Sequence, residues 1–265
     1  MSTPHPLPAH EVSGSGELTL FLLHGAYGDG RYFANTRDWL VAQGHRVVVW
    51  HCPGYGGSPG VSDPSIEAFG EAAAELIEAT GSERNIILGH SMGGRIAPRA
   101  AVLAADRVHG LVLSSTTAGL NTRTPEEQAQ FMAERVDPIT AGMSVGEYAP
   151  ELIKTMMGPD ASGSLVDTVM SVICEMNTET FKLSMAAIAS YTDGIETLQK
   201  QTVPVLLIAG ELDPACPPAG MQYMAELLPD AEYAEIAGVG HYGFAERPDE
   251  YHQLIERFLA SRFAN

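Results

Sequence analysis

The chain has 265 residues, of which 45% are hydrophobic and 18% charged, a balance typical of a folded protein with a sizeable core. Asp and Glu outnumber Lys and Arg by 33 to 15, and the formal net charge of −18 argues against nucleic acid or an anionic membrane as a partner. The three cysteines form no Cys-x-x-Cys pair, so neither a disulfide framework nor a metal site is expected. Residues 1–17 lack the basic and apolar regions of a signal peptide, and no apolar run reaches the roughly 20 residues of a membrane span, so we expect a cytoplasmic protein.

Short runs that are apolar almost throughout predict strands covered on both faces. In chain order they are Leu18–Leu23, Arg46–Trp50, Asn85–Leu88, Val108–Ser114, Val203–Ala209 and Tyr233–Ile236. Helical patterns separate or follow them, at Tyr32–Ala42, Asp63–Ala79, the segment after Ser91, Pro217–Leu228 and Pro248–Arg262. We expect Asp63 to cap the second of these helices, with Pro64 in its first turn. The alternation predicts an α/β fold, in which a mostly parallel central sheet carries helices on both faces.

One region interrupts the alternation. Between Gly119 and Asp193 only helical patterns occur, and the first opens on Thr124-Pro125-Glu126-Glu127, an N-cap with Pro at the first helical position and Glu at the third. A helical block inserted after a strand is expected to cover the carboxyl ends of the sheet as a lid. We therefore predict a core of residues 1–118 and 194–265 and a helical cap of residues 119–193.

The segment Gly89-His90-Ser91-Met92-Gly93 lies between a predicted strand and a helix, which is the context of a nucleophile elbow. Glycines two positions before and after Ser91 let strand and helix approach closely enough to hold a serine at a strained turn. A lone Gly-x-Ser-x-Gly match is equally typical of an ordinary turn. The interpretation therefore depends on residues that would activate Ser91.

A serine hydroxyl needs a general base, and the base needs a carboxylate to orient it. His241 is the candidate base, because it lies in a glycine-rich loop between the last predicted strand and the last helix. In this architecture the acid comes between serine and histidine in the chain. Asp213 follows the strand that ends at Ala209 and is the candidate acid, with Glu211 as the alternative.

Attack on an acyl group also requires two N–H donors for the developing oxyanion. We assign one to Met92, which follows the nucleophile, and the other to Ala26, in the loop after the first strand, with Tyr27 as the alternative. His24 and His90 adjoin tight glycine turns, so we expect structural hydrogen bonds from them. None of these roles needs a metal or an organic cofactor, and we predict none.

Together these segments resemble the α/β-hydrolase fold over nearly the whole chain. The matching segments are His24-Gly25-Ala26, Pro53-Gly54-Tyr55-Gly56-Gly57-Ser58, Gly89-His90-Ser91-Met92-Gly93-Gly94, Gly210-x-x-Asp213, and Gly240-His241 with Glu246-x-Pro248. The cap and flanks look most similar to the branch that holds 3-oxoadipate enol-lactonases, small esterases and cofactor-free haloperoxidases. Many relatives carry Asp where this chain has His51, and the resemblance implies a structural role there.

Serine at the elbow implies attack on an acyl carbon, and so hydrolysis of a small-molecule ester or lactone through an acyl-enzyme. The resemblance speaks against dehalogenases and epoxide hydrolases, whose elbow nucleophile is a carboxylate. One alternative is hydrolysis of a carbon–carbon bond in a diketone-type substrate, although relatives of that kind often carry Trp at the position of Tyr242. Another is non-enzymatic ligand binding, against which the intact Ser91, Asp213 and His241 argue.

The expected lid is acidic and rich in methionine. An anionic enol-lactone would need a cationic anchor, but residues 119–193 hold only four basic residues against eleven acidic ones, so the anchor would be Arg31 or Arg95 from the core. Seven of the 11 methionines fall in this block, which favours an adaptable, largely apolar pocket, with packing of the helical core as the alternative role. They are Met132, Met143, Met156, Met157, Met170, Met176 and Met185.

Overall fold

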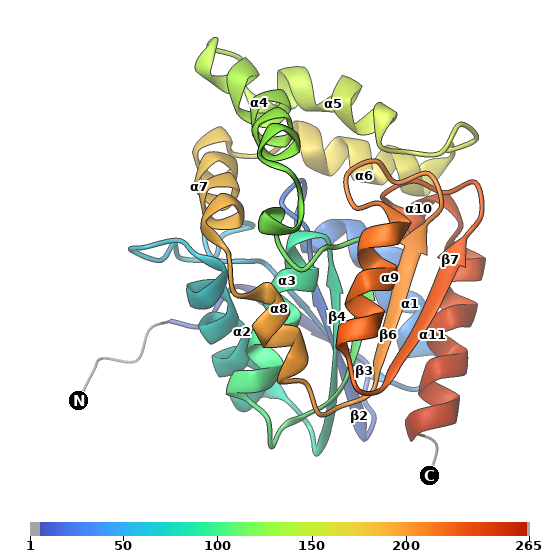
Figure 1. The fold of residues 1–265 in the computed structure, drawn as a ribbon. Coiled ribbons are helices and arrows are strands. Elements are labelled where there is room, and N and C mark those ends of the chain that lie inside the picture. The colour runs from blue at the N-terminus through green and yellow to red at the C-terminus, as the bar shows by residue number, and fades with distance from the viewer. Residues whose placement is uncertain (1–5, 264–265) are drawn as a thin grey trace.

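The computed structural model describes residues 6–263 and has a seven-stranded sheet with helices on both faces (Figure 1). The strands are β1 (His10–Ser13), β2 (Leu18–Leu23), β3 (Arg46–Trp50), β4 (Arg84–His90), β5 (Val108–Ser114), β6 (Val205–Gly210) and β7 (Ala231–Ile236). Their order across the sheet is β1-β3-β2-β4-β5-β6-β7, and only the β1–β3 pair within residues 6–263 is antiparallel. The predicted α/β class with a mostly parallel sheet is confirmed.

The helices of the core flank this sheet. They are α1 (Ala34–Ala42), which follows the 3₁₀ turn η1 (Gly30–Phe33), α2 (Ile66–Thr80), α3 (Met92–Leu103), α8 (Gly194–Gln199), α9 (Pro218–Leu227), α10 (Gly243–Glu246) and α11 (Pro248–Phe263). Helices α2, α3, α8 and α9 cover one face, whereas α1 and α11 cover the other (Figure 1). On the second face Trp39 stacks on His252, with 4.3 Å between ring centroids. Among the helices of residues 6–263, none combines the length and apolarity that crossing a membrane requires.

A block of helices is inserted between β5 and β6. It comprises η2 (Leu120–Thr122), α4 (Pro125–Thr140), α5 (Val145–Thr155), α6 (Ser164–Cys174) and α7 (Thr178–Ser190), and we call these the inserted helices. They lie above the carboxyl ends of the strands (Figure 1). Helix α4 begins as predicted, with Pro125 in its first turn and a capping box in which Thr124 and Glu127 each accept the other's backbone N–H.

The register of the sheet brings the predicted site loops together. Both β2 and β6 are buried at every position, as their continuous apolarity predicts. Strands β2 and β4 are parallel neighbours paired as far as Leu23 and Gly89, so the loop after β2 and the turn after β4 leave the same edge side by side. That edge is where ligands bind in open α/β sheets.

Two details differ from the expectations. Strand β1 is not predicted by the apolar pattern, because its sequence His-Glu-Val-Ser is polar and partly exposed, and only its pairing with β3 makes it a strand. Helix α2 begins at Ile66, and its N-cap is Ser65, whose hydroxyl accepts the N–H of Ala68 at 3.1 Å. The assignment of the cap to Asp63 was wrong, since Asp63 lies too far upstream to reach those amides.

Candidate active site

Ser91 lies at the turn between β4 and α3, at the carboxyl edge of the sheet. Its φ of 53° and ψ of −113° fall where residues with a side chain are seldom found, so the turn is strained. The N–H of Ser91 donates to the Ser114 carbonyl at 2.9 Å, and the Thr116 hydroxyl donates to the Ser91 carbonyl at 2.7 Å. Ser91 is half-buried whereas His90 and Met92 are buried, so the turn presents the serine to the space above the sheet.

The glycines around Ser91 are required by close backbone contacts. A Cβ atom at Gly93 would lie 2.1 Å from the Leu23 carbonyl oxygen, and one at Gly89 would lie 2.3 Å from the Gly93 oxygen. A Cβ atom at Gly94 would lie 2.6 Å from Thr116. Any larger residue at these three positions would push α3 away from the sheet and release the strained turn.

His241 and Asp213 form a buried, hydrogen-bonded pair. The Nδ1–H group of His241 donates to Asp213 Oδ2 at 2.7 Å, and the two residues are 3% and 2% exposed. The other carboxylate oxygen, Oδ1, accepts the N–H groups of Ala215 and Cys216, both at 2.9 Å. These bonds fix the carboxylate and place the imidazole proton on Nδ1, which leaves Nε2 free to accept a proton.

One narrow cavity, of about 30 Å³, is lined by Ser91, His241 and both predicted oxyanion donors, Ala26 and Met92. The small volume shows that the inserted helices leave only a narrow space above the serine. The remaining lining residues are Tyr27, Arg95, Phe131, Arg135, Met156, Met185, Ile188, Ala215 and Cys216. The alternative acid, Glu211, is exposed and accepts the N–H of Gly238 instead.

Two backbone N–H groups lie beside Ser91. The loop after β2 is pressed against the turn, since a Cβ atom at Gly25 would lie 2.9 Å from the Cβ of Ser91. Met92 is the first residue of α3, so its N–H has no partner within the helix. The N–H of Ala26 donates to no backbone or side-chain acceptor within residues 6–263. Both N–H groups are thus without a protein acceptor, and an oxyanion hole needs two such donors.

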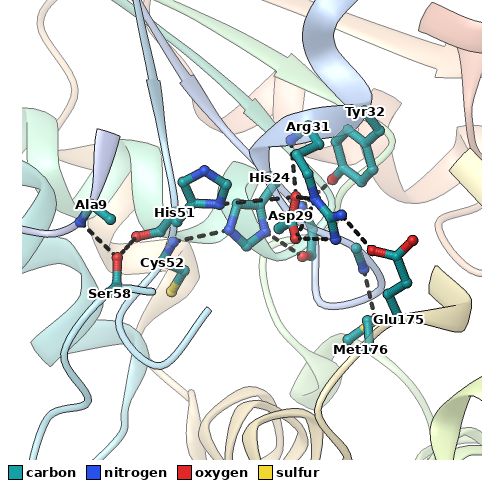
Figure 2. A network of polar contacts seen from close by, with 12 residues as sticks. Ala9, His24, Asp29, Arg31, Tyr32, His51, Cys52, Ser58, Glu175 and Met176 are labelled. Carbon is teal, nitrogen blue, oxygen red and sulfur yellow. Dashed lines mark hydrogen bonds and ion pairs between the residues drawn. The ribbon is translucent and has the colours of Figure 1, made fainter. Parts of the chain in front are cut away.

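Polar contacts fix the loop that carries Ala26 (Figure 2). The Nδ1–H of His24 donates to the Gly25 carbonyl at 2.8 Å, while His24 Nε2 accepts the N–H of Cys52 at 2.9 Å. The Tyr32 hydroxyl accepts the N–H of Gly25 at 2.5 Å. Burial lowers the pKa of His24 to about 4, so the ring is neutral and bonded at both nitrogens. The expected structural role of His24 is confirmed.

The same contacts join this loop to the inserted helices (Figure 2). Arg31 donates to both carboxylate oxygens of Asp29 and, at 2.5 Å, to Glu175. The N–H of Gly28 donates to the Met176 sulfur at 2.9 Å. Glu175 and Met176 follow α6, so the end of that helix is attached to the loop after β2. Arg31, one of the two core cations considered for an anionic substrate, is thus already neutralised by carboxylates.

His51 stands where many relatives carry Asp, and here the loop after β3 is anchored through its backbone. The Ser58 hydroxyl donates to the His51 carbonyl at 2.6 Å and accepts the N–H of Ala9 at 2.8 Å. Figure 2 shows Ser58 between the two segments. A hydroxyl that bridges two backbones therefore holds the turn in place, without a carboxylate at position 51.

Glu246 clamps the loop that carries His241. Its Oε2 atom accepts the N–H of Gly240 at 3.0 Å and that of Gly158 at 2.7 Å, and its Oε1 atom accepts the N–H of Tyr242 at 2.9 Å. Gly158 follows α5, so a single carboxylate joins the histidine loop to the inserted helices. Glu246, from the Glu246-x-Pro248 segment that resembles the α/β-hydrolase fold, thus fixes the position of the loop that carries His241.

We expect Glu246→Gln to lower the free energy of unfolding by about 1–3 kcal/mol, because one amide oxygen cannot serve three N–H donors and the new NH₂ group faces one of them. Turnover should fall about tenfold, since His241 loses its fixed position. Denaturant titration and initial rates measure the two effects. The matched control is Glu250→Gln, an exposed carboxylate at the start of α11. Equal stability and rate in the two variants would contradict the clamp.

Several side chains at the cavity belong to no motif, and sequence reasoning did not assign them roles. Arg135 and Phe131 come from α4, Met185 from α7, and Cys216 from the loop after β6. The only available signal was the methionine content of residues 119–193, and two of those methionines do line the cavity. Burial raises the pKa of the Cys216 thiol to about 12, so the thiol is protonated at neutral pH, although it lies near Asp213 and His241.

Residues 19–248 match the family described as alpha/beta hydrolase fold. The chain therefore belongs to the alpha/beta hydrolase fold family. It is 29% identical to a 2-hydroxy-6-oxononadienedioate/2-hydroxy-6-oxononatrienedioate hydrolase of Cupriavidus pinatubonensis, over 94% of this chain and 89% of the relative. Its structure is similar to that of a thermophilic esterase from Thermogutta terrifontis, with a TM-score of 0.84, 25% identity, and coverage of 97% of this chain and 94% of the esterase.

A further similarity is to part of a much larger protein. The chain is 27% identical to polyketide synthase ThaQ of Burkholderia thailandensis over 81% of its own length, but it spans only 10% of that synthase. The fold and the hydrolase relatives support an enzyme that acts on a small molecule.

Proposed function

We propose that the protein is a serine hydrolase that cleaves a carboxylic ester or lactone, with residues 119–193 as the lid over a core of residues 1–118 and 194–265. The observation that carries this proposal is the shared cavity: Ser91, at its strained turn, borders the same narrow cavity as His241, whose Nδ1–H donates to Asp213. The largely apolar lining supports a small, mainly apolar substrate.

In this mechanism Ser91 Oγ attacks the acyl carbon while His241 Nε2 takes its proton, and Asp213 stabilises the resulting imidazolium. The N–H groups of Ala26 and Met92 stabilise the oxyanion, each contributing up to about 2.7–4 kcal/mol to the barrier reduction. The alcohol leaves with the proton from His241. Water then attacks the acyl-enzyme, with His241 again as base, and frees Ser91. No metal or cofactor takes part.

Hydrolysis of a carbon–carbon bond is the second candidate, and the relative from Cupriavidus pinatubonensis favours it, since its name is that of a hydrolase of oxononadienedioate-type compounds. The same Ser91 and His241 would act there, so the substrate, and not the site, separates the two reactions.

The test is a panel of p-nitrophenyl esters, lactones and one vinylogous diketone, assayed with a chelator present, together with labelling by a fluorophosphonate. We expect ester or lactone turnover and a single label, which mass spectrometry places on Ser91. Turnover of the diketone alone would instead assign hydrolysis of a carbon–carbon bond as the reaction. A silent panel with no label on Ser91 would contradict enzymatic function and favour a ligand-binding role.

A further inference from the structure

Arg95 is a buried cation beside the nucleophile. It lies on α3, one turn after Ser91, and lines the same cavity while being 6% exposed. Its Nη2 atom donates to the Thr117 hydroxyl at 2.8 Å. Its Nε and Nη1 atoms are buried and have no hydrogen-bond partner within residues 6–263. Two of the three guanidinium nitrogens are therefore unsatisfied in a residue that lines the cavity beside Ser91.

The charge of Arg95 is not compensated by the described chain. A guanidinium stays protonated in proteins, and a buried charge is unfavourable unless it is paired. Burial lowers the pKa of Arg95, and two of its charged neighbours, Arg123 and Arg135, lower it further. Within residues 6–263 no carboxylate forms an ion pair with it, and the carboxylate of Asp213 is committed to His241 and two backbone amides. The cavity thus lacks an anion.

Two further guanidinium groups extend the positive region outward. Arg123 and Arg135 both lie over the ring of Phe131, at 4.8 and 3.7 Å from its centroid. They border a cleft of about 410 Å³ that shares Arg135 and Phe131 with the inner cavity. Two glutamates, Glu127 and Glu134, also border this cleft, and Glu134 lies 3.3 Å from Arg135. The uncompensated charge is therefore strongest at the inner end, at Arg95.

We propose that the acyl group of the substrate carries a carboxylate, which Arg95 binds inside the inner cavity; this rests on the proposed serine hydrolase function. The inner cavity is narrow and lined mostly by buried residues, whereas the cleft is bordered by exposed residues such as Glu127 and Gln130. The alcohol leaves through the cleft, and the acyl part remains inside with Arg95. The excess of acidic residues in the lid does not contradict this proposal, because the arginine that binds the carboxylate, Arg95, belongs to the core.

The first test compares mono-p-nitrophenyl adipate with neutral p-nitrophenyl hexanoate. We expect the wild-type enzyme to prefer the half-ester at least about tenfold in kcat/KM, and Arg95→Met to reduce this ratio about 10- to 100-fold, mainly through KM. Arg95→Lys should restore part of the ratio. The matched control is Arg99→Met on the same helix, whose arginine is paired with Asp193 at 3.3 Å and does not line the cavity. It should keep the wild-type ratio.

The second test measures binding without turnover. Calorimetry should detect adipate binding to the Ser91→Ala protein and at least tenfold weaker binding to Ser91→Ala/Arg95→Met. Binding that depends on Arg95, with no turnover of any ester, would support the anion site and contradict the hydrolase proposal. Equal rates on the two esters, with no adipate binding that depends on Arg95, would overturn the anion site and leave the hydrolase proposal intact.

Discussion

Replacing Ser91 by alanine is expected to reduce kcat/KM on the preferred ester about 10⁴- to 10⁶-fold, because no other group in the proposed mechanism can form the acyl-enzyme. Folding should be retained, since the turn is held by the backbone of Ser91 and not by its hydroxyl: its N–H bonds to Ser114 and its carbonyl to Thr116. Initial rates measure the loss, and thermal unfolding monitors the fold.

The matched control for this variant is Ser115→Ala. Ser115 is the other residue with a side chain and a positive φ in the described chain, at 45°, and it is buried at the end of the neighbouring strand. It shares the positive φ of Ser91 but does not border the cavity. Ser115→Ala should keep the wild-type rate. More than a trace of activity in purified Ser91→Ala protein would contradict its role as nucleophile.

Asp213→Asn is expected to reduce turnover about 10⁴-fold by reversing the imidazole tautomer. The N–H groups of Ala215 and Cys216 both point at Oδ1, so the amide oxygen of asparagine should take that position. Its NH₂ group then faces His241 Nδ1, which must become an acceptor. The proton moves to Nε2, and the ring can no longer accept the proton of Ser91. Steady-state kinetics measure the loss.

Glu211→Gln is the control for the acid, because Glu211 lies two residues earlier and is exposed, and among the described residues its carboxylate accepts only the N–H of Gly238. It should change kcat/KM less than about threefold, as surface substitutions usually do. A larger loss in Glu211→Gln than in Asp213→Asn would reassign the acid. NMR of the imidazole protons would report the tautomer in each protein.

The sheet could be predicted because its strands are fully covered. A parallel strand with helices on both faces must be apolar along its length, and β2 and β6 carry that pattern at every residue. Strand β1 lies at the edge, where no such pattern is required, and its pairing with β3 depends on the rest of the sheet. The cap of α2 was misplaced because Asp63 and Ser65 are both good N-caps, and only the path of the chain selects Ser65.

The positions of Ser91, His241 and Asp213 follow from local motifs at strand ends, and the structure brings the three together as the sequence order predicts. Their catalytic roles remain proposals. The sequence offered Arg95 and Arg31 as candidate cationic anchors, but it could not predict which arginines gather at the site. Arg95 comes from the core, whereas Arg123 and Arg135 come from the inserted helices, and their approach depends on how α4 packs on the core. The composition of residues 119–193 shows only that this segment is acidic overall, and not that two of its arginines gather at the site.

The way in which the inserted helices are attached to the core also determines which sequence changes the fold can tolerate. The two ends of the inserted segment are in close contact beside the core, since a Cβ atom at Gly194 would lie 1.6 Å from the Ala118 carbonyl oxygen. Doubling the length of a segment closed in this way costs only about 0.6 kcal/mol of chain entropy. Insertions, deletions or a complete exchange of α4 to α7 should therefore leave the sheet and its serine turn folded. New substrate specificities can therefore evolve, or be engineered, by replacing the inserted helices while the sheet and the residues of the core stay unchanged.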